Sequence, residues 1–239
     1  MTDKRKTSVT SITTFTGDET RVGWAKIYVM QIPKKPDSVR FKLVAGHPAL
    51  DLVNTLDWRF RPSGSEELLN SYADLLHFME QSGLMMPSEV QGFATSKPVK
   101  KKRGLSSTKE LRECLASICY AIADGQAPPI ESVKTLSAFA RTVRRSEHLE
   151  WRDCRLQWKA GADRVGASDA PFTRLLSTAL ELLTSGKIDQ LRACSNAECR
   201  WLFLDASKNK GRRWCDMKLC GNRIKARRYR GKQRAVDSQ

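Results

Sequence analysis

The sequence predicts an α+β protein in two parts: a mainly helical N-terminal domain with short strands over residues 41–186, and a small C-terminal four-cysteine zinc module that ends in a basic helix. Apolar residues recur every three or four positions in several segments of the first part, which is typical of amphipathic helices. Two cysteine pairs of identical spacing lie in the second part. With 239 residues, 40% of them hydrophobic, the chain is long enough for one core and one small module.

The charge of the chain narrows the class of partner. The formal net charge is +16 and the isoelectric point is near 9.8, which favours nucleic acid over an anionic membrane surface. No apolar run approaches the roughly 20 residues of a membrane span, and the N-terminus lacks the apolar centre of a secretory signal. We therefore expect a cytoplasmic protein without a membrane partner.

The chain begins with a segment that has no sustained periodicity. Residues 1–40 are polar and rich in Thr, Ser and Lys, which predicts a disordered leader. From Phe41 the pattern becomes strand-like, with apolar residues alternating up to Ala45. A Gly46-His47-Pro48 turn and further apolar residues up to Val53 follow, so we predict a hairpin, or a strand and a turn.

Helical patterns fill most of residues 63–186. The capping-box spacing of Ser63 and Glu66 predicts a helix that ends at Gly83. A weaker helix is expected at 88–94, a basic loop at 97–104, a helix from 107 to Gly125, and another helix from Pro129 to 143. Alternation that slips phase near Asp153 predicts a tight hairpin or bulge over 149–159. A final helix is expected from Asp169 to about 184.

Polar residues are dense in the run GHPALDLVNTLDWR, which starts at Gly46. Asp51, Asn54, Thr55 and Asp57 could line a ligand pocket, or could tie the turn to neighbouring backbone. The chain has no Gly-rich phosphate loop, no Gly-x-Ser-x-Gly elbow and no paired His/Glu metal-hydrolase motif. We therefore expect that the protein is not an enzyme. The enzyme alternative would place an active site at Asp51, Asn54 and Asp57.

The cysteine spacing predicts a metal site. Cys194-x4-Cys199 and Cys215-x4-Cys220 are separated by fifteen residues. Each four-residue loop can aim two sulfurs at one ion, and four soft thiolates suit tetrahedral Zn²⁺. The three histidines all lie outside this stretch, so the site is all-cysteine. The other three cysteines fit buried apolar positions, and an odd total excludes a complete disulfide framework.

The segment between the cysteine pairs predicts how the module closes. An apolar run from Trp201 to Leu204 is followed by residues 205–211, which have strong turn composition. A short hairpin here would bring Trp214 and Cys215 back beside Cys199. A module this small buries little apolar area, so metal binding should be coupled to its folding.

The last segment predicts a basic helix that binds nucleic acid. Fifteen Lys or Arg residues stand against four acids between Lys187 and Arg234. From Asn222, which can cap the helix, four arginines fall within about a 60° arc, and Lys225 lies on the opposite side. A solvated basic tail is the alternative interpretation. The predicted nucleic-acid contacts are Arg212, Arg213, Arg223, Lys225, Arg227, Arg228, Arg230 and Arg234.

Two motifs resemble known families. The run CRWLFLDASKNKGRRWCDMKLCGNRIKARRYR, which includes Cys220-Gly221-Asn222-Arg223, closely resembles the CGNR zinc finger. The run from Phe41 to Leu56 resembles the start of the ABATE-type domain that accompanies this finger in bacterial proteins described as putative stress-induced transcription regulators. The resemblance implies zinc held by the four cysteines, DNA binding and transcriptional regulation. It also implies a ligand-sensing role for His47, Asp51, Asn54 and Thr55.

Together these features predict a zinc-dependent, DNA-binding transcriptional regulator of the cytoplasm and nucleoid. Residues 41–186 would form the regulatory domain, 187–234 the finger and 235–239 a tail. The larger domain would respond to stress or to a small-molecule effector, or would form a homodimer. A zinc protein that binds RNA is the nearest alternative, because basic zinc modules serve either polymer.

Overall fold

The computed structural model describes residues 41–144, 147–152, 155–160 and 170–237. The predicted leader, residues 1–40, lies outside this range, as does most of the loop expected between the hairpin and the last helix of the larger domain. The described residues belong to one compact unit, 37–239. No described helix is both long and apolar enough to cross a membrane.

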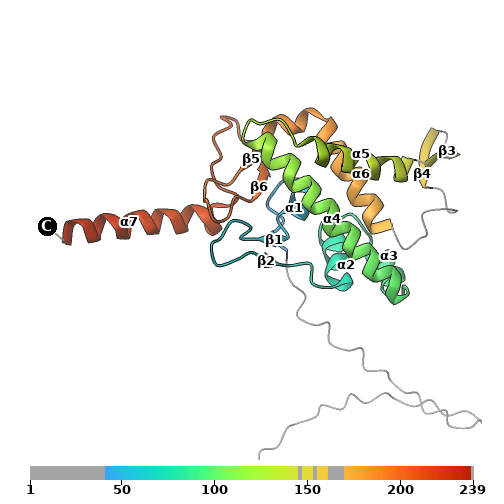
Figure 1. The fold of residues 1–239 in the computed structure, drawn as a ribbon, viewed down its shortest axis with the longest axis horizontal. Helices are drawn as coiled ribbons and strands as arrows, with labels where there is room; N and C mark the ends of the chain where they lie inside the picture. Colours follow the sequence, from blue (N-terminus) through green and yellow to red (C-terminus); the bar gives the residue numbers. More distant parts are fainter. Residues whose placement is uncertain (1–40, 145–146, 153–154, 161–169, 238–239) are drawn as a thin grey trace, which may run out of the picture. The chain divides into compact units, whose positions relative to one another are not determined.

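Helices form most of the larger domain (Figure 1). The longest, α4, contacts four other helices and one strand of the cysteine module, and so lies at the centre of the packing. Its face of Leu111, Leu115 and Ile118 is buried, as the periodicity predicted. The helices are α1 (Pro48–Val53), α2 (Tyr72–Gln81), α3 (Pro87–Ala94), α4 (Pro98–Ala123), α5 (Ile130–Arg144) and α6 (Ala170–Thr184).

Several helix boundaries confirm the sequence signals. α3, α5 and α6 occupy the predicted segments. Gly83 and Gly125 follow the ends of α2 and α4 with φ of 72° and 70°. Glycine adopts this left-handed conformation without the steric cost that a Cβ brings, so it ends a helix readily.

The hairpin, or strand and turn, predicted over residues 41–53 is wrong, because residues 41–44 form no strand and a helix forms over Pro48–Val53. His47 is the N-cap of α1, its Nδ1 accepting a hydrogen bond from the Ala49 N–H at 3.3 Å, and Pro48 occupies the first turn. Every residue from Ala49 to Val53 is buried. A segment buried on all sides carries no periodicity that could distinguish a strand from a helix.

Two helix starts also differ from the prediction. α2 begins eight residues late, at Tyr72, because Ser71 and Asp74 form the actual capping box. Conversely, the basic segment predicted as a loop at 97–104 is helical, since α4 begins at Pro98 and runs through Ser107 without interruption. Proline suits the first turn of a helix, where no N–H partner is needed. Lysine and arginine are good helix formers.

Among the described residues, strands form three two-stranded antiparallel sheets. β3 (Glu147–Arg152) and β4 (Arg155–Ala160) form the predicted hairpin, with Arg152 opposite Arg155. β1 (Leu56–Asp57) pairs with β2 (Glu66–Glu67). In the cysteine module, β6 (Leu202–Leu204) pairs with β5 (Leu191–Ala193). The hairpin predicted between this strand and the segment after residue 211 is wrong, because β6 pairs with β5, which precedes it in the sequence.

The cysteine module shares the hydrophobic core of the helical domain. Buried residues of both parts, including Leu50 and Leu175 on one side and Leu191 and Phe203 on the other, belong to a single cluster. The backbone also crosses between the parts, since the Leu204 N–H donates to the Ala45 carbonyl at 2.8 Å. The module is therefore built onto the helical domain.

Candidate metal centre and basic helix

The four predicted cysteines come together at one point. Their sulfur atoms all lie within 4.8 Å of one another, and all four residues are buried. The sulfurs of Cys199 and Cys215 are 3.8 Å apart, far beyond a disulfide bond. A tetrahedral zinc ion with Zn–S bonds of about 2.3 Å has sulfur–sulfur edges of about 3.8 Å. The geometry therefore fits one Zn²⁺ ion, held by Cys194, Cys199, Cys215 and Cys220.

The first cysteine loop is shaped by Asn196. Its carbonyl accepts hydrogen bonds from the N–H groups of Cys199 and Arg200, at 3.0 and 2.9 Å. Its side chain is buried, and its Nδ2 donates toward the Cys220 sulfur at 3.7 Å. Arg200 then adopts a φ of 48°, which turns the chain away from the metal site. An amide that donates to a metal-bound sulfur stabilises its negative charge.

The second cysteine loop is a turn capped by Asp216. Its side chain accepts a hydrogen bond from the Leu219 N–H at 2.9 Å, and its carbonyl accepts from the N–H groups of Cys220 and Gly221. These contacts fold Met217–Gly221 into the π-helix η3. Cys220 thereby faces the other sulfurs, directly before α7 begins.

Four thiols in so small a volume require a cation before all four can ionise. A hydrogen bond with Cys194, together with burial, raises the pKa of the Cys199 thiol. Bound Zn²⁺ supplies the opposing charge and holds all four sulfurs as thiolates. Zinc is therefore the cofactor of this centre. Since all four positions are taken by protein ligands, the role of the metal is structural.

Gly221 leaves room for the side chains that cover the turn. A Cβ at this position would lie 2.6 Å from the Met217 sulfur and 3.3 Å from Cδ1 of Trp214. Both distances are shorter than normal van der Waals contact. The glycine between Cys220 and Asn222 therefore permits close packing against the metal loop.

The predicted basic helix is α7 (Asn222–Asp237), which continues directly from η3. Figure 1 shows it as a straight rod extending beyond β5 and β6. The side chains of Arg223, Lys225, Arg227 and Arg230 are exposed. Arg227 makes a weak ion pair with Glu198, at 3.7 Å. Arg228 and Arg234 lie in the same helix, but their side chains are outside the part that the structure describes.

Arg212 differs from the other predicted nucleic-acid contacts. Its guanidinium donates to the carbonyls of Val44 at 3.0 Å and Trp214 at 3.0 Å, and also to that of Cys215. Its Cζ lies 4.2 Å from the centre of the Phe203 ring. Arg212 therefore joins the cysteine module to the segment before α1. Arg213, by contrast, is exposed.

The polar residues of the larger domain bond to nearby backbone. Buried Asp51 accepts a hydrogen bond from the Ala45 N–H at 3.0 Å. Burial raises the pKa of Asp51 to about 6, although this hydrogen bond opposes the rise. Burial also lowers the pKa of His47, the N-cap of α1. The His47 side chain therefore caps α1, and the Asp51 carboxyl group bonds to the segment before it.

Asn54 and Thr55 connect three parts of the fold. Asn54 bonds Leu202 of β6 twice, with its Nδ2 donating to the carbonyl and its Oδ1 accepting from the N–H, both at 2.9 Å. Thr55 donates to the Leu52 carbonyl at 2.7 Å and accepts from Arg112 at 3.2 Å. These hydrogen bonds occupy polar atoms of Asn54 and Thr55, the residues proposed from the sequence as possible ligand contacts.

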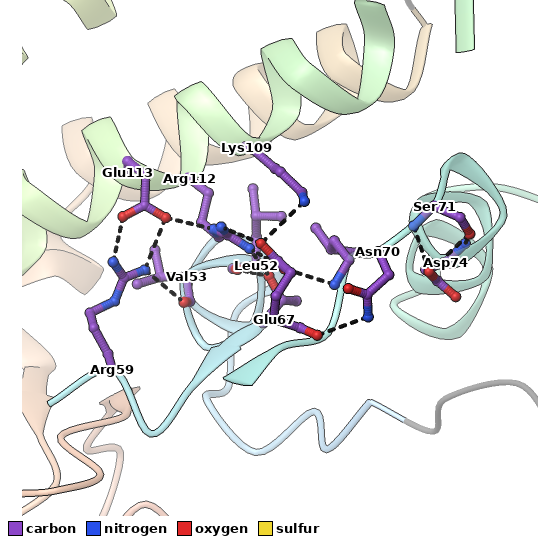
Figure 2. A network of polar contacts seen from close by, with 12 residues as sticks. Leu52, Val53, Arg59, Glu67, Asn70, Ser71, Asp74, Lys109, Arg112 and Glu113 are labelled. Atoms are coloured by element: carbon purple, nitrogen blue, oxygen red, sulfur yellow. Dashed lines mark hydrogen bonds and ion pairs between the residues drawn. The ribbon is translucent and has the colours of Figure 1, made fainter. Parts of the chain in front are cut away.

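A partly buried network holds the loop between β1 and β2 on α4 (Figure 2). Arg112 donates to both oxygens of Glu67, at 2.7 and 2.8 Å. Glu113 bonds Arg112 and also receives the guanidinium of Arg59. The side chain of Arg112 is only 4% exposed. A role for Arg112 was not predicted from the sequence, because the pattern indicates only a polar position of an amphipathic helix.

Another contact between the helical domain and the cysteine module was also not predicted from the sequence. Arg200, in the first cysteine loop, donates to both oxygens of Asp124 at 2.7 and 2.8 Å. Asp124 is the C-cap of α4. The guanidinium also lies near the rings of Phe60 and Tyr120. No spacing rule links residues 76 positions apart, so only the fold reveals this pair.

Comparison with known families agrees with the two-part organisation. Residues 46–186 match the model of the ABATE family, which is described as "Putative stress-induced transcription regulator". Residues 190–233 match the model of the CGNR zinc finger. No curated protein matches the chain.

Proposed function

Because the chain belongs to the ABATE family and ends in a CGNR zinc finger, we propose that it is a zinc-dependent, DNA-binding transcriptional regulator. The single observation that carries this proposal is the attachment of α7 to the zinc centre. Cys220, a zinc ligand, lies two residues before the first residue of α7. The ion therefore sets the direction in which a strongly basic helix leaves the finger.

The charge of α7 favours a polyanion as its partner. Arg223, Arg227 and Arg230 lie along one side of the helix by their spacing, and Lys225 lies on the other. A helix charged on two sides cannot bury either side in a protein core, but it can lie in a groove of duplex DNA between two phosphate backbones. We propose these four residues, together with Arg213, Arg228 and Arg234, as the DNA contacts. Arg212 is not among them, because its guanidinium donates to the backbone carbonyls of Val44 and Trp214.

The larger domain supports regulation better than catalysis. Asp51 and Asn54 bond to nearby or facing backbone, which removes the reason to place an active site there. The same domain reaches the finger through Asn54 and through the Arg200–Asp124 pair. We propose that this domain responds to stress or to a small-molecule effector and transmits the change through those contacts.

Two further parts of the proposal concern assembly and location. Ile130 and Val133 of α5 are 69% and 43% exposed, and apolar residues exposed together favour contact with a second copy of the chain. A homodimer would double the basic surface. A DNA-bound regulator would also be found in the cytoplasm, on the nucleoid.

The proposal is tested by mapping bound genomic sites for the wild type and for Cys215→Ser. Loss of one zinc ligand should abolish specific peaks, because α7 is then no longer held in place. Cys114→Ser is the matched control, since its buried sulfur donates only to the Ser132 carbonyl. Identical peaks for the wild type and Cys215→Ser would contradict the proposal.

Purified protein provides the second test and separates DNA from RNA. With about six phosphate contacts, the logarithm of the binding constant should fall with the logarithm of salt concentration at a slope near −5. Duplex DNA and structured RNA then compete at fixed salt. Stronger binding to the RNA would favour the RNA-binding alternative.

A further inference from the structure

Trp58 lies between the two parts of the protein and contacts an arginine from each. The Cζ atom of Arg61, in the loop after β1, is 4.0 Å from the centre of the indole ring. The Cζ atom of Arg223, in the first turn of α7, is 4.8 Å from it. Both distances are within the range of cation–π contacts. We call these three residues the Trp58 clamp.

The backbone of the clamp is held in an unusual conformation. Trp58 has a φ of 50°, a region that residues with a Cβ rarely adopt. Asp57 fixes it, since its carboxylate accepts a hydrogen bond from the Trp58 N–H at 2.7 Å. The Arg61 N–H closes the turn by donating to the Trp58 carbonyl at 2.8 Å. Strain that the surroundings maintain in this way often marks a functional position.

The loop that carries the clamp is anchored on both sides. Arg59 is bound to Glu113 of α4, and Glu67, at the end of the loop, is bound to Arg112 of the same helix (Figure 2). The indole and the Arg61 guanidinium are therefore placed before any ligand arrives. Groups positioned in advance lose little freedom on binding.

The clamp carries positive charge that is not paired with a carboxylate among the described residues. Within the described residues, neither Arg61 nor Arg223 forms an ion pair. A cavity of about 90 Å³ beside Trp58 is lined by Lys42, Asp57 and Arg223, and also by the zinc ligands Cys199, Cys215 and Cys220. The single acid there is engaged with the Trp58 N–H. The zinc–thiolate centre can offset the charge of Arg223, which leaves the guanidinium of Arg61 to attract an external anion.

We propose that the Trp58 clamp binds a phosphodiester group of the nucleic-acid backbone, so that the ABATE domain supplies part of the DNA-binding surface. This inference rests on the proposed function. Arg223 lies on the same side of α7 as Arg227 and Arg230. The anion at the clamp is therefore one phosphate of the same nucleic acid that α7 contacts. Arg61 makes the phosphate contact and Trp58 positions the guanidinium.

The test compares Arg61→Gln with Arg141→Gln in the full, zinc-loaded chain. Arg141 is exposed on α5. Its substitution by Gln removes the same charge at a site away from the clamp. Binding to duplex DNA is measured across a salt series. Loss of one phosphate contact should reduce the magnitude of the log–log slope by about 0.9 for Arg61→Gln and leave it unchanged for Arg141→Gln. Equal slopes for the two variants would overturn the inference.

The role of Trp58 is tested with two substitutions. Glycine adopts a φ of 50° without strain, so Trp58→Gly keeps the turn but removes the ring. It should reproduce the smaller slope of Arg61→Gln in protein that is still folded and zinc-loaded, at a lower thermal stability because the indole packs against the core. Trp58→Phe should retain the wild-type slope. Wild-type binding by Trp58→Gly would contradict the positioning role.

These outcomes distinguish the two proposals. If the wild type binds with a steep salt dependence and both arginine variants bind like it, only the clamp is rejected. If the wild type itself shows no salt-dependent binding to nucleic acid, the proposed function fails, and the clamp fails with it.

Discussion

Asp51 shows how burial changes the chemistry of one residue. Its carboxyl group has a pKa of about 6 in the folded protein, above its ordinary value of 3.8. A raised pKa stabilises the fold at low pH, below the unfolded value. This contribution is lost as the pH rises from about 4 through 6, because the buried group must then ionise. Asp51 is therefore a source of instability near neutral pH.

Asp51→Asn should consequently gain stability relative to the wild type as the pH rises. The amide oxygen can still accept from the Ala45 N–H, but it carries no charge. The advantage of the variant at pH 8 over that at pH 4.5 should be about 2 kcal/mol, since part of the effect is already present at pH 4.5. Urea unfolding of both zinc-loaded proteins at the two pH values measures it. A difference independent of pH would show that burial of the carboxylate has no energetic weight.

Gly221 allows a prediction about close packing. In Gly221→Ala the new methyl group would meet the sulfur of Met217. Overpacking of this kind costs about 1–3 kcal/mol, and the flexible tip of Met217 favours the lower end. The cost should appear as a lower thermal stability of the zinc-loaded protein.

Met217→Ala provides the control for this substitution. Met217 is 46% exposed, so its truncation alone should have a small effect. In that background the additional cost of Gly221→Ala should largely disappear, since neighbouring residues are non-additive. Additive effects would place the clash elsewhere, for example at Trp214.

At the scale of elements, Asn54 acts as a substitute for a neighbouring strand. Its amide pairs with both backbone groups of Leu202 in β6, as a residue of an adjacent strand would. Asn54→Ala should therefore leave a buried N–H and a buried carbonyl without partners. The expected loss is about 2–4 kcal/mol in the free energy of unfolding.

Asn70→Ala is the matched control for this prediction. The exposed Asn70 amide donates one hydrogen bond to the Glu67 carbonyl at 2.9 Å. Exposed positions of this kind usually change stability by less than about 0.5 kcal/mol. Equal effects of the two substitutions would mean that the contact with β6 contributes nothing.

The elements show why some parts of the fold were predictable. α5 and α6 carry long apolar stripes on polar helices, and the spacing alone locates them. α1 does not, because every residue from Ala49 to Val53 is buried and the stripe disappears. The start of α4 was wrongly predicted as a loop since its basic first turns lack a repeating apolar pattern, although proline and lysine are compatible with a helix there.

The candidate site shows the same division. The repeated spacing of Cys194, Cys199, Cys215 and Cys220 predicted their convergence, because local turns bring each pair together. The roles of Arg200, Arg212 and Trp58 could not be assigned from spacing, since each has a partner far away in the sequence, which is Asp124, Val44 and Arg223 respectively. Arg212 in particular resembles a surface contact in the sequence, and only its bonds to Val44 and Trp214 reveal an interior role.

At the scale of the whole molecule, the zinc centre and the helical domain should unfold together. Leu191, Phe203 and Leu204 of the finger belong to the same core as α1, α4 and α6. Removal of zinc should therefore destabilise the complete unit, by an amount that depends on the free zinc concentration.

Hydrogen exchange measures this coupling. On addition of a chelator, amide protection should fall in α4 and α6 as well as in residues 187–221. Re-addition of zinc should restore both. If α4 and α6 kept their protection while the finger lost its own, the two parts would be independent domains, contrary to the shared core.

The hydrogen bond from Leu204 to Ala45 limits how this finger can be engineered. A chimera that transfers residues 187–237 alone to another host would expose the inner face of β6 and leave Arg212 without its partner at Val44. A finger that can be transferred to another protein would also need residues 41–58, because they supply the surface against which β6 packs. Graft design should begin from that larger, discontinuous unit.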